Sequence, residues 1–261
     1  MIAARILSNP PADLIAGKPI PLAGDGLRST CPAHPDTLVW QGTPVTSHVD
    51  QAVEAARAVQ PKWAALPIER REAVLKRFAA IARDRVDDAA SLICDETGKA
   101  LWDSKAEAGL LASKVDITLA DSEGQNWGRS RVGGFSTAIN DSREGKAWFR
   151  PHGVLAVLGP FNFPAHLPNG HIIPALLMGN AVVFKPSDKT PAVGQLLAEL
   201  LCQALDEEGI TSEIGGGVVN LVHGAAEPAK ALVAHDGIDG ILFTGSWPVG
   251  RSILEANLDR P

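Results

Sequence analysis

Three kinds of feature are scarce in this chain, and each scarcity excludes a class of protein. There are three cysteines among 261 residues, Cys31, Cys94 and Cys202, and their spacing suits neither a metal site nor a disulfide framework, so we expect reduced thiols. No run of about 18 apolar residues is present, which argues against a membrane-spanning helix. The net charge of -6 provides no broad basic surface for a nucleic-acid backbone.

The overall composition is that of a soluble globular protein, with 45% hydrophobic and 21% charged residues. The length is sufficient for one large α/β domain, with or without a smaller appendage. Asn9-Pro10-Pro11 follows Met1 too closely for the apolar region of a secretory leader to form. We therefore expect a cytoplasmic location.

The first half of the sequence changes from turn-rich to helical. Up to about Gly42, glycine, proline and short apolar runs predict small strands that fold over the surface of the main body. Ser47 is a plausible N-cap for a helix whose apolar stripe ends near Pro61. Further apolar stripes follow, one of them closed by Gly98, so segment 48–120 is predicted to be mainly helical.

The second half alternates between strands and helices. Segment 121–150 has weak periodicity and charged turns, which predicts a projecting β-arm. Continuous apolar runs at 153–158, 181–184, 218–222 and 240–243 are typical of strands buried on both faces, and helical stretches at 165–178, 191–207 and 227–235 separate them. This alternation predicts an α/β fold with a doubly wound parallel sheet, whose ligands bind at the carboxyl ends of the strands.

The first strand end presents Asn162, in Gly159-Pro160-Phe161-Asn162-Phe163-Pro164, where a helix begins. Its side-chain amide could stabilise a developing oxyanion. An asparagine that only satisfies the backbone of its own turn is the alternative. Position alone leaves both interpretations open.

The other strand ends carry groups suited to a nucleotide. Lys185 and Asp188 follow the second strand and could hold ribose hydroxyls, although a solvated loop is the alternative. Gly224 follows the third strand, either for close backbone approach or as a plain turn glycine. Gly245 and Ser246 follow the fourth strand, where a helix start could bind pyrophosphate. Four such turns at one sheet edge indicate nucleotide binding.

Two other patterns carry less weight. Gly215-Gly216-Gly217 precedes a strand and does not open a helix, so it is interpreted as a flexible turn. His166 and His171 are five residues apart, which is not the i, i+4 spacing of a helical metal site. No metal site is expected.

These residues together resemble the aldehyde dehydrogenase superfamily. The similarity rests on Gly159-Pro160-Phe161-Asn162-Phe163-Pro164, Phe184-Lys185-Pro186-Ser187 and Phe243-Thr244-Gly245-Ser246, in that order. Within the superfamily, residues 150–157 and 166–172 look like those of the enzymes that oxidise N-succinylglutamate 5-semialdehyde to N-succinylglutamate in arginine catabolism. The resemblance covers nearly the whole chain, tightly from about Arg150.

The resemblance implies a Rossmann-like cofactor domain, divided into an amino-terminal part at 1–120, an oligomerisation β-arm at 121–150 and a core at 151–261. It implies NAD as cofactor, an aldehyde as substrate, and a homo-dimer or homo-tetramer. Asn162 would help bind the oxyanion, Lys185 and Asp188 the adenosine ribose, and Ser246 the pyrophosphate. Asp188 stands where glutamate is commoner, a shorter reach that bears on the choice between NAD and NADP.

The expected site residues lie at the strand ends and on the predicted helix 165–178, which follows the first of these strands. One face of that helix, beside the reacting carbon, would line the substrate, with Gly170 leaving room and a histidine holding a carboxylate. Those residues are His166, Leu167, Gly170 and His171. The expected cofactor contacts are Leu158, Gly159, Pro160, Phe161, Lys185, Ser187, Asp188, Gly224, Phe243, Gly245, Ser246 and Val249.

The resemblance places the general-base glutamate in a Glu-Leu/Met-Gly-Gly motif just beyond these 261 residues, and the nucleophilic cysteine later, in a separate catalytic domain. Cys31 lies in a turn-rich stretch, and Cys94 and Cys202 lie in apolar helical stripes, so none is suited to replace it. The alternative to an enzyme is therefore a chain without catalytic activity, which binds a dinucleotide or pairs with other subunits. A Rossmann-type reductase with a Tyr-Lys pair is excluded because the chain has no tyrosine.

Overall fold

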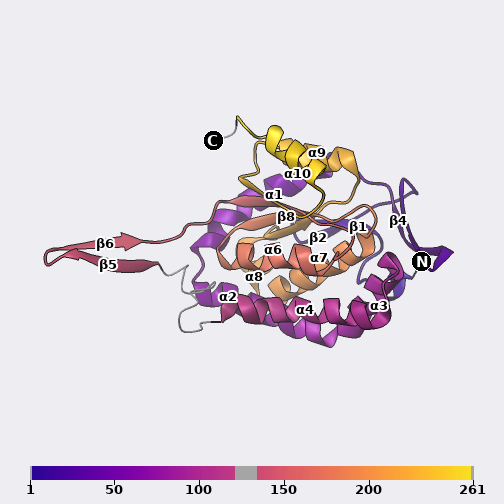
Figure 1. Ribbon diagram of the computed structural model, residues 1–261, viewed down its shortest axis with the longest axis horizontal. Coiled ribbons are helices and arrows are strands. Elements are labelled where there is room, and N and C mark those ends of the chain that lie inside the picture. Colours follow the sequence, from indigo (N-terminus) through magenta and orange to yellow (C-terminus); the bar gives the residue numbers. More distant parts are fainter. Residues whose placement is uncertain (1, 121–133, 260–261) are drawn as a thin grey trace.

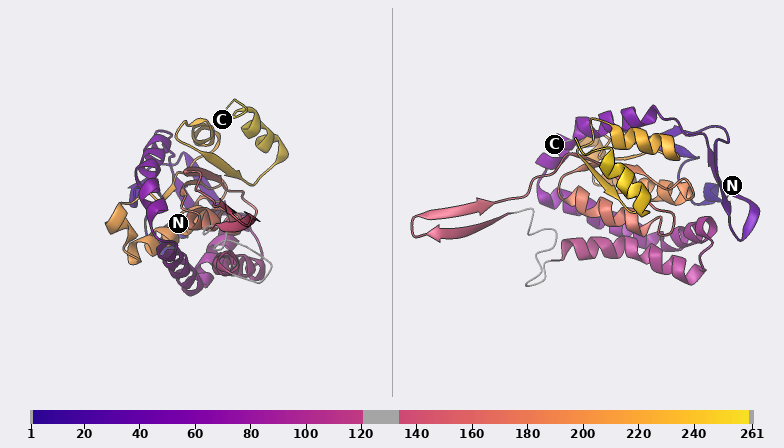
Figure 2. Two further views of the ribbon diagram at one scale, coloured as in Figure 1. Left: turned by 90° about the vertical axis from the view of Figure 1, so that its left-hand side faces the viewer. Right: turned by 45° about the horizontal axis from the view of Figure 1, so that its top comes forward.

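A six-stranded sheet with helices on both faces forms the centre of the protein (Figures 1 and 2). The structure is a computed structural model that describes residues 2–120 and 134–259. Four strands are parallel and occur in the order β10-β7-β8-β9, which confirms the predicted α/β fold. Their bounds are β7 Val154–Leu158, β8 Ala181–Lys185, β9 Val219–Leu221 and β10 Gly240–Phe243.

Alternate residues of the central strands pack on opposite helix layers. In β7, Val154, Ala156 and Leu158 belong to the cluster on the side of α1 (His48–Ala65) and α9 (Ala226–Ala234). Leu155 and Val157 belong to the cluster on the side of α6 (His166–Leu177) and α7 (Pro191–Glu207). The period of two in a strand buried on both faces explains why its sequence is continuously apolar.

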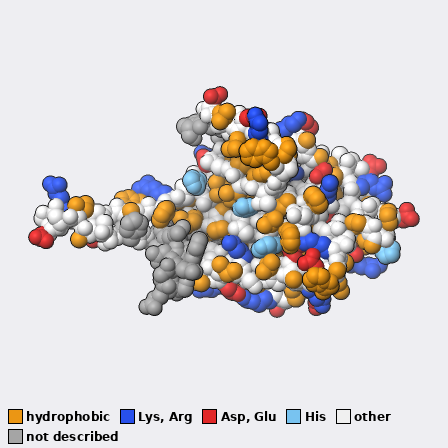
Figure 3. Space-filling view, in the orientation of Figure 1, with side chains coloured by type: hydrophobic (Ala, Val, Ile, Leu, Met, Phe, Trp, Pro, Cys, Tyr) orange, Lys and Arg blue, Asp and Glu red, His pale blue; other side chains and the backbone are white. Residues whose placement is uncertain are grey.

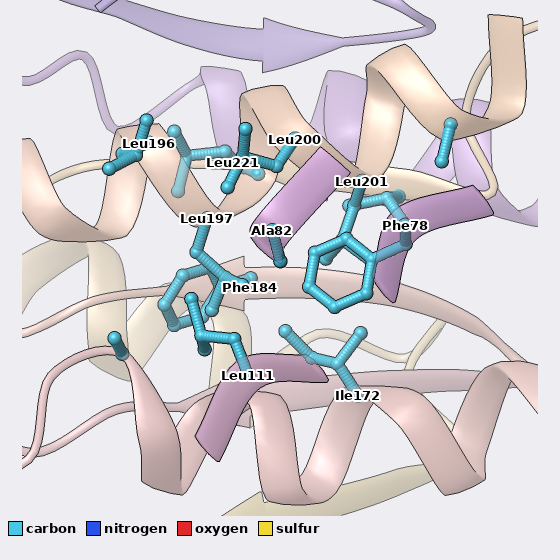
Figure 4. Close-up of a cluster of buried hydrophobic side chains, with 14 of the residues drawn as sticks. Phe78, Ala82, Leu111, Ile172, Phe184, Leu196, Leu197, Leu200, Leu201 and Leu221 are labelled. Carbon is cyan, nitrogen blue, oxygen red and sulfur yellow. The ribbon is translucent and has the colours of Figure 1, made fainter. Parts of the chain in front are cut away.

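Three further helices cover the α6 and α7 layer. They are α2 (Ile68–Asp84), α3 (Val86–Thr97) and α4 (Leu101–Leu119), so segment 48–120 is mainly helical as predicted. Figure 4 shows Phe78 of α2, Leu111 of α4 and Ile172 of α6 around Phe184 of β8. Each such side chain contributes roughly 1.5–3 kcal/mol by leaving water. The helix α3 ends at Gly98 in the left-handed conformation (φ 74°), also as predicted.

The first 42 residues do not simply cover the surface, and that prediction is wrong for their first half. Strand β1 (Ala12–Ile15) is buried and joins the main sheet antiparallel to β9, with Leu14 opposite Leu221, and β2 (Lys18–Pro21) pairs with it at the edge. Asn220 reinforces the junction by accepting a hydrogen bond from the Ala16 amide at 3.0 Å. Strands β3 (Leu27–Cys31) and β4 (His34–Gly42) form a separate antiparallel pair.

The predicted end of the first helix near Pro61 is also wrong, because α1 continues to Ala65 with Pro61 inside it. Trp63 is fully buried, and its indole donates a hydrogen bond to the Leu176 carbonyl at 3.1 Å. This packing offsets the backbone hydrogen bond that the proline removes. Ser47 precedes the helix, but its side chain makes no capping hydrogen bond.

An antiparallel hairpin, β5 (Phe135–Asn140) and β6 (Arg143–Ala147), projects from the body (Figure 1). It corresponds to the second part of the predicted arm, while residues 121–133 lie outside the described part of the chain. The role of the arm in an oligomer and the predicted domain boundaries stay predictions. The remaining elements are η1 (Ala3–Arg5), α8 (Ile210–Ile214) and α10 (Trp247–Glu255).

Among the residues that the structure describes, no helix is both long and apolar enough to span a membrane. The same residues contain no group of three or more His, Cys, Asp or Glu side chains that could hold a metal ion.

Candidate functional site

The strand order fixes where a ligand can enter. Counted along the chain, the parallel strands β7, β8, β9 and β10 are arranged with β8 and β9 on one side of β7 and β10 on the other. The order therefore reverses between β7 and β10, and an open sheet of this kind has its crevice at the carboxyl ends of those strands. The turns after β7 and β10 lie at that crevice.

A pocket of about 720 Å³ occupies this position and is lined by the ends of β7, β8 and β10 and by the start of α9. It contains every expected cofactor contact except Gly224, which lies one residue before the lining. The pocket also contains Asn162. Four lining residues were not foreseen from the sequence, namely Ala225, Ala226, Ala229 and Thr244. The Gly-Ala-Ala run that opens α9 is the signal that could have indicated the first two.

Lys185 ends β8 with its side chain almost fully buried beside the pocket. Its Nζ donates hydrogen bonds to the carbonyl oxygens of Pro186 at 2.8 Å and Gly224 at 2.7 Å. Burial lowers the pKa of Lys185 to about 8, and the nearby Asp188 carboxylate opposes that shift. An ammonium has three N–H donors, so one remains for a ligand after the two carbonyl contacts.

The turn after β8 presents polar atoms next to Lys185. Ser187 Oγ accepts a hydrogen bond from the Lys189 amide at 3.2 Å and contacts Asp188 Oδ1 at 3.4 Å. Asp188 is partly buried, and Lys189 Nζ lies 4.6 Å from the centre of the Phe161 ring. Lys185 is therefore not part of a solvated loop, which was the alternative drawn from the sequence, whereas Lys189 is exposed to solvent.

The turn between β10 and α10 packs closely on Phe243. A Cβ on Gly245 would clash with the end of the Phe243 ring, so a side chain there would require that ring to move. The Ser246 side chain makes no capping hydrogen bond, and a proline occupies the first turn of the helix. The amides of Gly245, Ser246 and Trp247 have no partner among the described residues. Unpaired amides at a helix start favour an anion.

The turn after β7 is held by groups from the amino-terminal helices. Glu107 of α4 is buried, and its Oε1 accepts hydrogen bonds from the amides of Ala165 at 3.0 Å and His166 at 3.2 Å. Its other oxygen pairs with Lys99 Nζ at 2.7 Å, and this ammonium lies 3.6 Å from the centre of the Phe163 ring. Sequence reasoning missed Glu107, because its partners are more than 50 residues away.

Asn162 occupies that held turn, with an exposed side chain. Its amide makes no hydrogen bond to any described residue, so the alternative that it satisfies its own turn has no support in the structure. The side chain borders the pocket and is free to bind a ligand oxygen.

The expected substrate residues lie on α6, beyond the Asn162 turn. His171 Nε2 is 2.8 Å from Thr244 Oγ1, so this helix is joined to the turn after β10. Burial lowers the pKa of both His166 and His171, which favours their neutral forms and weakens them as partners for a carboxylate. A Cβ on Gly170 would meet no atom within 4 Å, so open space lies beside this glycine.

None of the three thiols has the environment of a nucleophile. Cys94 donates a hydrogen bond to the Lys99 carbonyl at 3.1 Å, and burial, followed by the nearby Asp95, raises its pKa. Burial raises the pKa of Cys202 to about 12. Cys31 is buried in the main core cluster. A reactive cysteine needs the opposite, a lowered pKa and access to solvent.

Comparison with known proteins points to one family. The family model described as the aldehyde dehydrogenase family matches residues 23–260. Among curated proteins, the chain is 45% identical over 220 residues to an N-succinylglutamate 5-semialdehyde dehydrogenase of Novosphingobium aromaticivorans, covering 82% of this chain and 42% of that protein. It is 44% identical over 238 residues to N-succinylglutamate 5-semialdehyde dehydrogenase 2 of Caulobacter vibrioides, covering 91% and 46%.

Solved structures give the same result. An NAD-dependent benzaldehyde dehydrogenase from Corynebacterium glutamicum matches with a TM-score of 0.81 at 28% identity, over 95% of this chain and 52% of that one. An NADP-dependent enzyme from E. coli matches with a TM-score of 0.82 at 27% identity, over 97% and 50%. The chain thus spans about half the length of the relatives it matches.

The raised thiol pKa values predict slow alkylation. With a pKa of about 12, Cys202 is in the thiolate form only to about one part in 10⁴ at pH 8. We expect Cys202 in the native chain to react with iodoacetamide at least about a hundredfold more slowly than a free thiol, and all three cysteines of the urea-unfolded chain to react at the free-thiol rate. Site-resolved mass spectrometry measures this, and a fast-reacting cysteine in the native chain would contradict the assignment of all three as structural.

Proposed function

The chain belongs to the aldehyde dehydrogenase family, and we propose that it supplies the nicotinamide-dinucleotide site of an enzyme that oxidises an aldehyde to a carboxylate. The observation that carries this proposal is the pocket at the switch point, where Lys185, Gly245 and the open start of α10 meet. A bound dinucleotide would supply the hydride acceptor. The other groups in the proposed reaction are protein residues, some from this chain and some from outside these 261 residues.

The pocket fits such a cofactor in its donor groups and its shape. Unpaired amides at Gly245, Ser246 and Trp247 suit a pyrophosphate, and the glycine allows close approach. The third N–H of Lys185 and the Asp188 carboxylate suit the hydroxyls of a ribose. Asp188 also disfavours a phosphate at that ribose by like-charge repulsion, so we propose NAD as the cofactor in preference to NADP.

Asn162 is proposed to act on the substrate carbonyl. Its free amide donates a hydrogen bond to the oxygen as negative charge develops there, and Glu107 and Lys99 keep its turn in place. The attacking thiolate and the general base are proposed to come from outside these 261 residues, because the environments of Cys31, Cys94 and Cys202 suit no nucleophile.

For the substrate we propose N-succinylglutamate 5-semialdehyde. The support is that the curated relatives named for this substrate share 44–45% of their matched residues with the chain. The open space beside Gly170 on α6 provides room for an acylated amino acid. His166 and His171 act there as neutral hydrogen-bond groups, since burial lowers their pKa values.

A binding-only chain remains the competing function. Such a chain binds dinucleotide as an enzyme would, but it takes part in no oxidation in any assembly. The two differ in one measurement: whether a protein that contains this chain reduces NAD when given the aldehyde.

Binding of NAD should depend on pH through Lys185. Since its pKa is about 8 in the folded chain, the ammonium is complete below that value and is lost above it. We expect the affinity for NAD to be constant from pH 6 to 7 and to fall above pH 8, by at most about tenfold per pH unit. Quenching of tryptophan fluorescence measures the binding.

Lys185→Met should bind NAD weakly and without this pH dependence. Lys230→Met is the matched control, because the Lys230 side chain is 75% exposed on α9 and pairs with Glu227 of the same helix. An equal pH response in Lys185→Met would assign the dependence to another group. Failure of the unaltered chain to bind at millimolar NAD would exclude the proposed cofactor site.

Asn162→Ala should slow the reaction in a protein that contains this chain and is active. Loss of one oxyanion donor lowers kcat by about 10²–10³. The affinity for NAD should stay the same, because Lys185 and the α10 turn are unaltered. Asn140→Ala in the exposed hairpin is the control, since the Asn140 side chain accepts hydrogen bonds from the Ser142 amide and hydroxyl in its own turn, away from the pocket. Equal kcat values for the two variants would remove Asn162 from the reaction.

Gly170→Leu should obstruct the substrate. The new side chain would enter open space, so the fold tolerates it, but we expect the KM for the aldehyde to rise by about tenfold while the KM for NAD does not change. Gly109→Leu on the exposed side of α4 is a matched control, because a Cβ there also meets no atom within 4 Å. An unchanged KM for the aldehyde in Gly170→Leu would overturn the proposed substrate wall.

A further inference from the structure

A cluster of buried polar side chains lies where β1 joins the main sheet. Asp13 of β1 has no exposed surface. Its Oδ2 contacts His48 Nδ1 at 2.7 Å, and its Oδ1 accepts hydrogen bonds from the His223 amide at 2.7 Å and from His223 Nδ1 at 2.9 Å. One carboxylate of the amino-terminal segment is therefore bound twice to the turn that follows β9.

Each nitrogen of the His223 ring faces an oxygen atom. Nδ1 lies 2.9 Å from Asp13 Oδ1, and Nε2 lies 3.2 Å from the Pro191 carbonyl oxygen. A ring that donates a hydrogen bond from both nitrogens fits this geometry. The Trp40 indole packs against the ring with centroids 4.7 Å apart, a contact that would favour a cation. The side chains of Asp13 and His223 are both fully buried, with 0% and 1% of their surface exposed.

His223 connects the two turns that frame the Lys185 side of the pocket. The next residue, Gly224, has a φ of 144° and accepts the Lys185 ammonium at its carbonyl oxygen, 2.7 Å away. Pro191 begins α7, directly after the turn that carries Ser187 and Asp188. The ring therefore links the chain just after β9 to the start of α7 through one contact, and to β1 through the other.

We propose that Asp13 and His223 are a positioning pair for the cofactor pocket: Asp13 holds the His223 ring as an imidazolium, and the ring fixes the position of the adjacent Gly224 carbonyl, which accepts a hydrogen bond from Lys185. Neither residue lines the pocket. The inference rests on the proposed cofactor site for its functional consequence, although the geometry of the pair does not depend on a cofactor.

The chemistry of the pair favours positioning over simple attachment of β1. A fully buried ion pair carries a large desolvation cost, so an apolar pair of similar volume would join β1 to the sheet at least as well. Only a ring with two oriented donors can bind the carboxylate and the Pro191 carbonyl at once. The His48 ring lacks this connection, since Asp13 is its one hydrogen-bond partner among the residues that the structure describes.

His48 therefore provides the matched control. Asp13→Asn keeps the shape of the side chain but removes the charge that holds the second proton on His223. His48→Phe removes the other donor to the same carboxylate, keeps a ring of similar size, and leaves the link from His223 to Pro191 in place. Both variants should lower the melting temperature, which shows that fold stability alone does not separate them.

Three readouts test the pair in the 261-residue chain. In the unaltered chain, ¹⁵N spectra should show both ring nitrogens of His223 protonated at pH 7, whereas Asp13→Asn should show one unprotonated. The Lys185 ¹³Cε resonance should shift in Asp13→Asn and not in His48→Phe. The dissociation constant for NAD should rise about tenfold in Asp13→Asn and stay unchanged in His48→Phe.

The outcomes separate the two proposals. An unprotonated ring nitrogen in the unaltered His223, or equal effects of the two variants on the Lys185 resonance, overturns the positioning pair. Absence of NAD binding by the unaltered chain overturns the proposed cofactor site, and the two spectra then still decide the pair.

Discussion

Turns that are buried at the ends of buried strands need partners for their backbone amides, and carboxylates from the amino-terminal 120 residues provide them in this protein. Glu107 accepts the amides of Ala165 and His166 after β7. Glu96 accepts those of Ala192 and Val193 after β8, at 3.0 and 2.8 Å. Asp13 accepts that of His223 after β9. An unpaired buried amide is costly, so the sheet and its turns depend on these long-range contacts.

The fourth turn is the exception. No described carboxylate binds the amides of Gly245, Ser246 or Trp247, and α10 and the residues after it expose Trp247, Val249, Leu254 and Leu258. Figure 3 shows hydrophobic side chains gathered over this helix. Where the protein supplies no anion, a helix start attracts one from outside. The three occupied turns thus form a rigid frame around the one that is open.

Sequence reasoning found the strands and their ends because those signals are local. Apolar runs at β7 and β8 indicate burial on both faces, and the residues that follow them could be placed at one sheet edge by topology alone. The three carboxylates could not be found in this way, because each acts on amides more than 50 residues distant. The same reason explains the error over β1, whose partner Leu221 lies some 200 residues away, and the error at Pro61, where the buried Trp63 decides the helix end.

Burial destabilises the charged form of Lys185, and a bound ligand can offset part of that cost. Desolvation lowers the pKa of Lys185 to about 8 from 10.5, so the folded chain binds its proton less tightly than the unfolded chain. Below pH 8 the charged side chain therefore opposes folding by an amount on the order of a few kcal/mol, and this penalty disappears as the pH rises from 8 towards 10.5. A ligand oxygen that accepts the third N–H of Lys185 offsets part of that penalty. Under the proposed function, cofactor binding and fold stability would be coupled at Lys185 Nζ, the atom that the Gly224 carbonyl holds.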